Sequence, residues 1–260
     1  MDIRLDGKSA VITGGSKGLG LAMAQRFAAS GADVAILART PGTLAEAKQQ
    51  IQAGAKGKVA TVSADVSQAA DIRRAYDTVM SELGKIDILV NNAGQGIRGP
   101  SEELTDEVWQ ADLDLKLFAQ IRLSRLVFPQ MKERRWGRII NVLNLGAKAP
   151  VRTARRPRSA VPRKWRSPRC CRARARRTTF SSTRCMSGSL SATRSSAATS
   201  ARAPMSRSKN FIARAGRDVP LGRMGRAEEF ANIACFLVSD AASYVTGCAI
   251  NVDGGRCPVV

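Results

Sequence analysis

Thr13-Gly14-Gly15-Ser16-Lys17-Gly18-Leu19-Gly20 is the stretch of this sequence that decides the fold. It follows a short apolar run at 9–12 and leads into residues 21–27, whose apolar side chains recur at helical spacing. A strand, a glycine-rich turn and a helix, in that order, form a site for a dinucleotide pyrophosphate. Glycines let the backbone approach the phosphates, and the N-terminus of the helix attracts their charge. Such a loop alone is a weak indication of a dinucleotide site, so the rest of the chain has to support it.

Strand patterns alternate with helical patterns along the first 150 residues. Strands are predicted at 9–13, 33–37, 59–62, 86–90 and 138–143, and helices from the loop to about 30 and over 40–52, 70–83 and 105–134. A helix at 227–239 and a strand at 248–252 follow near the C-terminus. This alternation predicts an α/β fold with a doubly wound parallel sheet of the Rossmann type. The length of 260 residues fits a single domain over 1–260.

The composition excludes several classes of function. The chain has no histidine and its six cysteines form no CxxC pair, so we expect no metal site and exclude Ser-His-Asp and Cys-His mechanisms. No apolar run approaches the ~20 residues of a membrane span, and residues 1–6 lack the apolar core of a signal peptide. We therefore expect no membrane partner and a cytoplasmic location.

The net charge of +21 is concentrated in one part of the chain. Residues 151–217 contain 19 arginines and lysines and no acidic residue, which leaves +2 for the remainder. Within this part, residues 151–204 have no apolar periodicity and are rich in Arg, Ala, Ser, Thr and Pro. We expect an irregular basic segment here, either disordered or translated out of frame.

Two interpretations of this basic segment (151–204) stay open. A GC-rich gene read out of frame yields such a patternless string, and compensating shifts near residues 150 and 204 would restore the frame. A genuine basic insert would instead bind phosphates in a salt-dependent way. Trp165 and Phe180 are its only aromatic residues, so no specific nucleic-acid partner is expected. Reading the gene in all three frames across 145–215 separates the two.

Four motifs follow one another along the chain. They are the loop at 13–20, Asn91-Asn92-Ala93-Gly94, Gly137-Arg138-Ile139-Ile140-Asn141-Val142, and a C-terminal stretch from Pro220-Leu221-Gly222-Arg223 through Tyr244-Val245-Thr246-Gly247 to Asp253-Gly254-Gly255. In this order they resemble the short-chain dehydrogenase/reductase family, over residues 1–150 and 215–256. The resemblance implies hydride transfer between a nicotinamide cofactor and a small carbonyl or alcohol substrate.

The resemblance also implies which residues bind the cofactor. They are Gly14, Ser16, Lys17, Gly18, Leu19 and Gly20 in the loop, Arg39 after the second predicted strand, Asp65 and Val66 beside the adenine ring, and Asn91, Ala93 and Gly94. An acidic residue after the second strand would favour NAD(H) through the ribose hydroxyls. Arg39 can instead pair with a 2′-phosphate, and Lys17 adds a second cation. We predict NADP(H), with NAD(H) less favoured; the alternative is that Arg39 is a solvated surface residue.

The catalytic positions that the resemblance implies hold unsuitable residues. The family uses a Tyr as the proton donor, a Lys four residues later, a Ser that holds the substrate oxygen and an Asn in the long helix. The matching positions hold Pro157, Val161, Asn144 and Lys116, respectively. No Tyr-xxx-Lys sequence occurs anywhere, since the only tyrosines are Tyr76 and Tyr244. We expect either an atypical reductase or a protein that binds the cofactor without turning it over.

The predicted long helix over 105–134 has a second use in the family, where it packs between subunits. The resemblance therefore implies a homodimer or homotetramer. The second helix of that interface would fall in the basic segment, which puts the interface in question. Ordinary packing of one helix face against the core is the alternative.

Overall fold

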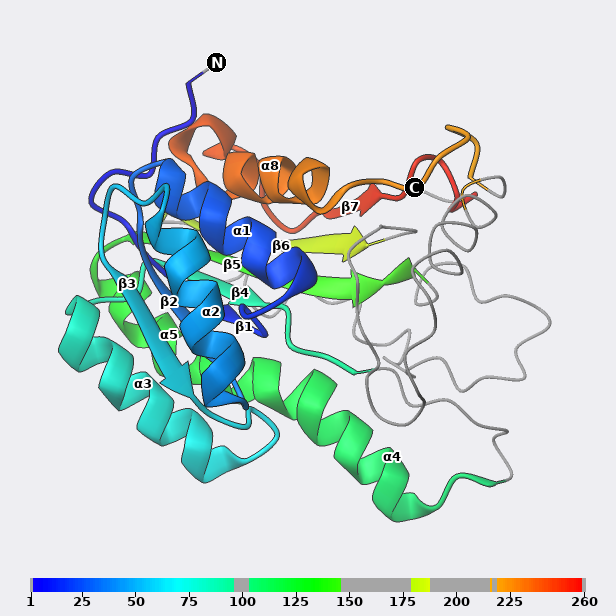
Figure 1. The fold of residues 1–260 in the computed structure, drawn as a ribbon, viewed down its shortest axis with the longest axis horizontal. Coiled ribbons are helices and arrows are strands. Elements are labelled where there is room, and N and C mark those ends of the chain that lie inside the picture. The colour runs from blue at the N-terminus through cyan, green and yellow to red at the C-terminus, as the bar shows by residue number, and fades with distance from the viewer. Residues whose placement is uncertain (1, 96–102, 146–178, 188–215, 217–218, 259–260) are drawn as a thin grey trace.

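A parallel sheet forms the centre of the structure (Figure 1). The computed structural model describes residues 2–95, 103–145, 179–187, 216 and 219–258. Within these residues seven strands lie in the order β3-β2-β1-β4-β5-β6-β7, and all neighbouring pairs are parallel. The strands are β1 (Ser9–Thr13), β2 (Asp33–Ala38), β3 (Val59–Ser63), β4 (Ile88–Asn91), β5 (Trp136–Asn144), β6 (Thr179–Ser187) and β7 (Ala249–Val252).

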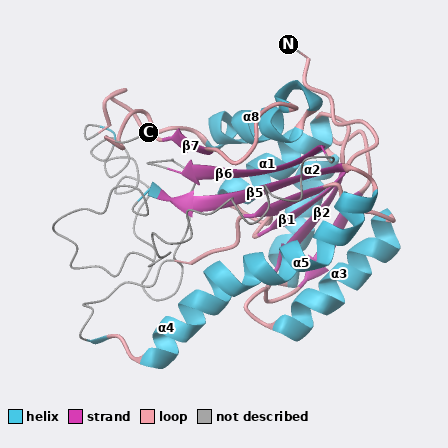
Figure 2. Ribbon diagram, turned by 180° about the vertical axis from the view of Figure 1, so that it is seen from behind, coloured by secondary structure: helices cyan, strands magenta, loops and turns pink. Residues whose placement is uncertain are grey.

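Helices cover both faces of the sheet (Figure 2). One face carries α1 (Gly18–Ala29), α2 (Pro41–Gln52) and α8 (Ala227–Val238), and the other carries α3 (Ala69–Leu83), α4 (Asp106–Leu113) and α5 (Ala119–Glu133). A short 3₁₀ helix, η5 (Asp240–Ala242), follows α8. No helix in the described parts of the chain is long and apolar enough to cross a membrane.

The central strands are buried on both sides. Successive side chains of a strand point to opposite faces, so Ile12 joins the core beneath α1, α2 and α8, whereas Val11 joins the core beneath α3 and α5. All five residues of β1 are buried. A strand covered on both faces has a continuous apolar sequence, which is the pattern predicted as a strand at 9–13 and 33–37. The predicted doubly wound parallel sheet is confirmed.

The helix predicted over 105–134 is interrupted. A π-helical segment, η2 (Asp114–Phe118), separates α4 from α5. A π turn has one residue more than an α turn, so it shifts every later side chain around the helix axis. Such turns often occur at functional sites, and Lys116 lies within this one.

The described part of the basic segment, residues 179–187, forms a strand, which corrects the prediction of irregular structure for these residues. β6 pairs in parallel with β5 from Trp136↔Thr179 to Asn144↔Ser187 and with β7 on its other side. Backbone hydrogen bonds to two neighbouring strands place these nine residues in the sheet, and such bonds require no apolar pattern. The rest of 151–204 lies outside the described residues.

Candidate nucleotide-binding site

The residues predicted to bind the cofactor meet at one edge of the sheet. Residues 14–17 join β1 to α1 and 18–20 form the first turn of α1, Arg39 follows β2, and Asp65 and Val66 follow β3. Asn91 ends β4, and Ala93 and Gly94 follow it. The carboxyl ends of parallel strands lie at the same edge. The strand order reverses between β1 and β4, and doubly wound folds bind their ligands in the crevice at such a reversal.

Thr13, the last residue of β1, is bonded to the turn that follows β4. Its Oγ1 accepts hydrogen bonds from the backbone N–H groups of Asn92 and Ala93, both at 2.9 Å, and donates to the Val90 carbonyl at 3.4 Å. The Asn92 Nδ2 in turn donates to the carbonyl oxygens of Thr13 (3.0 Å) and Gly14 (3.1 Å). The glycine loop and the asparagine turn are therefore joined across the reversal point.

Neither Thr13 nor Asn92 is among the residues predicted for the cofactor site, although both lie inside the quoted motifs. Both are buried, at 2% and 6% exposure. A polar side chain that ends an apolar strand is a signal that could have identified them, because buried polar groups are nearly always hydrogen-bonded. The sequence alone does not show that Thr13 and Asn92 bond each other, because they are 79 positions apart.

At Gly14 and Gly20 the backbone lies so close to neighbouring atoms that only glycine fits, and we call these two positions the glycine cradle. A Cβ atom on Gly20 would lie 2.2 Å from the Gly14 carbonyl oxygen and 2.7 Å from Asn92 Nδ2. Gly14 has a φ of 64°, and a Cβ atom there would lie 3.0 Å from Ala93 Cα. No side chain fits between the loop, the start of α1 and the asparagine turn.

The N-terminus of α1 is open to an anion. Lys17 is the N-cap residue, makes no capping hydrogen bond with its side chain and is exposed. The first turn of the helix contains no acidic residue. Its unpaired N–H groups and the positive end of the helix dipole therefore favour a phosphate at this point.

Arg39 stands exposed just past the end of β2. Its backbone is fixed, because the Ser63 Oγ at the end of β3 donates a hydrogen bond of 3.1 Å to the Arg39 carbonyl. Its guanidinium makes no hydrogen bond or ion pair with the described residues. An arginine with a fixed backbone and a free head group is suited to bind a phosphate bidentately.

Asp65 shapes the turn after β3. Its Oδ1 accepts hydrogen bonds from the Ser67 N–H (3.0 Å) and the Ser67 hydroxyl (2.8 Å), and its own N–H donates to Asp71 Oδ2 (2.9 Å). The Arg74 guanidinium, and after it this Asp65 amide, hold the pKa of Asp71 below its usual range. Val66 is buried at 5% exposure. The turn is therefore rigid where it faces the predicted adenine position.

Two buried amide oxygens at this edge fit a ligand with hydrogen-bond donors. Asn91 donates from Nδ2 to Asn141 Oδ1 at 2.8 Å, but its Oδ1 and that of Asn92 have no partner among the described residues. A buried polar atom left unpaired costs about 1–3 kcal/mol. Together with the glycine cradle and the open helix end, these oxygens fit a dinucleotide better than an apolar ligand.

The positions that the resemblance assigns to catalysis are described only in part. Lys116 lies in η2, where its Nζ is ion-paired with Asp112 Oδ1 one helical turn earlier. Asn144 is the exposed last residue of β5. Pro157 and Val161 lie outside the described residues.

Both tyrosines lie away from these positions. Tyr76 is on α3, where its hydroxyl accepts a hydrogen bond from Gln130 Nε2 at 3.2 Å. Tyr244 is fully exposed and follows η5. Among the described residues, no group of three Cys, Asp or Glu side chains could hold a metal ion.

Comparison with known proteins identifies the family. The family model for short chain dehydrogenases matches residues 8–154, so the match ends close to the start of the basic segment. The chain belongs to the short-chain dehydrogenase/reductase family, and its relatives are oxidoreductases.

Relatives align with the chain along nearly its whole length. It is 31% identical over 268 residues to a probable 2,4-dienoyl-CoA reductase of Bacillus subtilis, with 97% of each chain covered. It is 30% identical over 261 residues to the 3-oxoacyl-[acyl-carrier-protein] reductase FabG of Escherichia coli, with 97% of this chain and 98% of FabG covered. The crystal structure of L-sorbose reductase from Gluconobacter frateurii, complexed with NADPH and L-sorbose, is 29% identical and matches with a TM-score of 0.86 over 100% of both chains.

Replacing Gly20 by alanine tests the cradle. The new Cβ atom would overlap the backbone of Gly14, so we expect Gly20→Ala to lower the free energy of unfolding by about 1–3 kcal/mol and to weaken dinucleotide binding. Denaturant unfolding and a fluorescence titration measure the two effects.

Gly42→Ala is the matched control, since Gly42 lies in α2 with open space around the position of its Cβ. It should leave binding unchanged and alter the free energy of unfolding by at most about 1 kcal/mol in the stabilising direction. If Gly20→Ala and Gly42→Ala had the same free energy of unfolding and the same affinity for the dinucleotide, the requirement for glycine at position 20 would be contradicted.

Proposed function

We propose that this chain binds NADP(H) at the edge formed by β1, β2, β3 and β4, and that its chemistry is the interconversion of a small carbonyl and an alcohol. We further propose that turnover by the chain as it stands is slow or absent. One contrast supports both statements: the groups suited to the nucleotide are all present, whereas the Tyr-xxx-Lys pair is missing from the whole sequence.

The charge at the rim of the site supports NADP(H) over NAD(H). Arg39 occupies the place where an acidic residue would accept hydrogen bonds from the ribose hydroxyls of NAD(H). Arg39 and Lys17 are both exposed cations at this edge, and both are suited to a 2′-phosphate of an adenosine bound near the end of β2. The L-sorbose reductase that matches this chain is complexed with NADPH, which agrees with this preference.

Each group of the site has a role in holding the dinucleotide. The glycine loop and the N-terminus of α1 would hold the pyrophosphate, Arg39 and Lys17 the 2′-phosphate, and Asp65 and Val66 the adenosine. Asn91, Ala93 and Gly94 would form the wall beyond β4. When bound, the cofactor supplies a hydride or accepts one.

Proton transfer is the step for which the four family positions hold no suitable residue. Carbonyl reduction needs an acid placed near the substrate oxygen, with a pKa matched to the task. Pro157 and Val161 carry no titratable group, and the Asn144 amide can donate or accept a hydrogen bond but does not release a proton. Lys116 is an ammonium held in an ion pair with Asp112. Without an acid at these positions, general acid catalysis worth about 10²–10⁴-fold would be missing.

A binding protein is the second candidate function. A chain that keeps the nucleotide site and lacks the acid could act through cofactor binding or through a partner, including a second copy of itself. We propose self-association through α4 and α5, the helices that correspond to the subunit interface of the family. The half-exposed Leu113, Leu117 and Ile121 support this proposal.

Reversing the charge of Arg39 tests the cofactor preference. Losing a charge-assisted pair with phosphate costs about 1.5–3 kcal/mol, so the Kd of NADPH should rise at least about tenfold in Arg39→Asp, while the Kd of NADH stays level or falls. Fluorescence titration of both cofactors measures the gap. Lys56 is also exposed but lies just before the N-terminal end of β3, whereas the candidate site lies at the carboxyl ends of the strands. Lys56→Asp makes the same change of charge there and should leave the Kd of both cofactors unaltered. Equal affinity of the unmodified protein for NADPH and NADH would contradict the proposal.

Binding and turnover measured on the same sample separate the two candidate functions. We expect saturable binding of NADPH by calorimetry together with no consumption of NADPH above the buffer rate across a panel of aldehydes, ketones and 3-oxoacyl thioesters. FabG from Escherichia coli serves as the active control. Turnover comparable to that control would contradict the proposed loss of activity, and absence of NADPH binding would contradict the proposed function itself.

A further inference from the structure

Arg122 on α5 joins three separate parts of the structure. Its Nη1 donates to the carbonyl oxygen of Ser67 at 2.9 Å, and its Nη2 is bonded to Asp114 Oδ1 at 3.0 Å. Its guanidinium also lies 5.3 Å from the centre of the Phe118 ring. Ser67 belongs to the turn after β3, whereas Asp114 and Phe118 are the first and last residues of η2. One side chain therefore connects the turn beside the predicted adenine position with the π-helical segment that carries Lys116.

The ion pair between Arg122 and Asp114 is partly buried and is held in place by a further hydrogen bond. The side chains of Arg122 and Asp114 are 29% and 25% exposed, so solvent screens their interaction less than that of an exposed pair. Asp114 is itself held, because its Oδ2 accepts a hydrogen bond from Gln110 Nε2 at 3.0 Å. The planar fork of an arginine can serve two acceptors on different segments at once, which the single ammonium of a lysine cannot do with the same geometry.

Apart from Arg122, the side chains that hydrogen-bond Asp65 and Ser67 come from the turn itself or from α3, while Val66 is buried in the core beneath α3 and α5. Asp65 bonds the backbone and hydroxyl of Ser67, and Asp71 of α3 bonds the Asp65 N–H. Both residues belong to the turn itself or to the helix that immediately follows it. Arg122 supplies the bond from across the groove, from a position 55 residues further along the chain.

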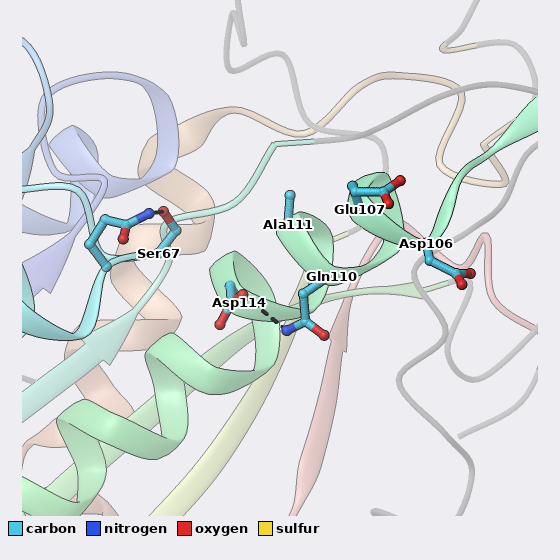
Figure 3. Close-up of a pocket in the computed structure, with 7 residues that line it drawn as sticks. Ser67, Asp106, Glu107, Gln110, Ala111 and Asp114 are labelled. Carbon is cyan, nitrogen blue, oxygen red and sulfur yellow. Dashed lines mark hydrogen bonds between the residues drawn. The ribbon is translucent and has the colours of Figure 1, made fainter.

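A groove separates the two sides. Figure 3 shows Ser67 on the turn facing the helix that carries Gln110, Ala111 and Asp114. The groove has a volume of about 500 Å³, and its other lining residues include Asp106 and Glu107. Arg122 is bonded to Ser67 on one side of the groove and to Asp114 on the other.

We propose that Arg122 is a positioning residue for the adenine end of the cofactor. By holding the Ser67 carbonyl, it fixes the Asp65-Val66-Ser67 turn against which the adenine would pack, and it ties that turn to η2. This inference rests on the proposed function. The guanidinium of Arg122 is already bonded to Asp114 and to the Ser67 carbonyl. We therefore expect Arg122 to affect the cofactor by positioning the turn and not by direct contact.

A comparison of four variants tests the inference, with NADPH and adenosine 2′,5′-bisphosphate as the probes in calorimetric titrations. The bisphosphate contains the adenine half of the cofactor alone. We expect Arg122→Met to raise both Kd values by the same factor, at least about fivefold. Arg122→Lys, which keeps the charge but not the fork, should give intermediate values for both ligands.

Two controls on the same helix distinguish positioning from general stability. Arg125→Met removes an exposed arginine and should alter neither Kd. Val127→Ala opens a cavity in the core, since Val127 is fully buried, and should lower Tm at least as far as Arg122→Met while leaving both Kd values unchanged.

The outcomes separate this inference from the proposed function. If the unmodified protein binds neither probe, the proposed function fails, and the inference fails with it. If the unmodified protein binds and Arg122→Met binds equally well, only the inference is overturned. The inference is also overturned if Val127→Ala weakens both probes as much as Arg122→Met does, or if Arg122→Met weakens NADPH but not the bisphosphate.

Discussion

The hydroxyl of Thr13 is the group on which the candidate nucleotide-binding edge of the sheet, at the carboxyl ends of β1 to β4, depends. We call it the nucleotide edge. It accepts the N–H groups of Asn92 and Ala93, while the Asn92 side chain returns two hydrogen bonds to the carbonyls at the start of the glycine loop. The absence of a side chain on Gly20 follows from this arrangement, because a Cβ atom there would meet both Gly14 and Asn92. The N-terminus of α1, which we propose faces the phosphates, is therefore positioned by the turn after β4 as well as by its own strand.

The two halves of the family site have separate structural supports. The nucleotide half rests on β1 to β4, whose buried apolar runs and short loops lie within the first 95 residues. The chemical half would rest on the end of β5, on η2 and on residues after 150. A change confined to the later part, whether a frame shift or an insert, can therefore remove the proton donor and leave the nucleotide edge intact. Arg122 joins the two halves, since it bonds both the turn after β3 and Asp114 of η2.

Much of the fold can be predicted from the sequence, because strands buried on both faces have continuous apolar sequences. The strand at 9–13 and the helix beginning at Ala227 are found where the pattern puts them. β6 could not be predicted, since its place in the sheet depends on backbone pairing with β5 and β7 and not on apolar periodicity. The π segment could not be predicted, because its extra residue shows only as one irregular interval in an otherwise helical apolar pattern. The contacts of Thr13 with Asn92 and of Arg122 with Ser67 join distant positions, which no local pattern specifies.

The affinity for NADPH of two Thr13 variants tests the account most directly. Thr13→Ser keeps the hydroxyl and should bind within about threefold of the unmodified protein. Thr13→Val keeps the shape but leaves the N–H groups of Asn92 and Ala93 without their acceptor, at about 1–3 kcal/mol for each buried group. The account predicts that Thr13→Val stays folded by circular dichroism and that its Kd for NADPH rises at least about tenfold. A folded Thr13→Val protein that binds NADPH as tightly as Thr13→Ser would contradict it.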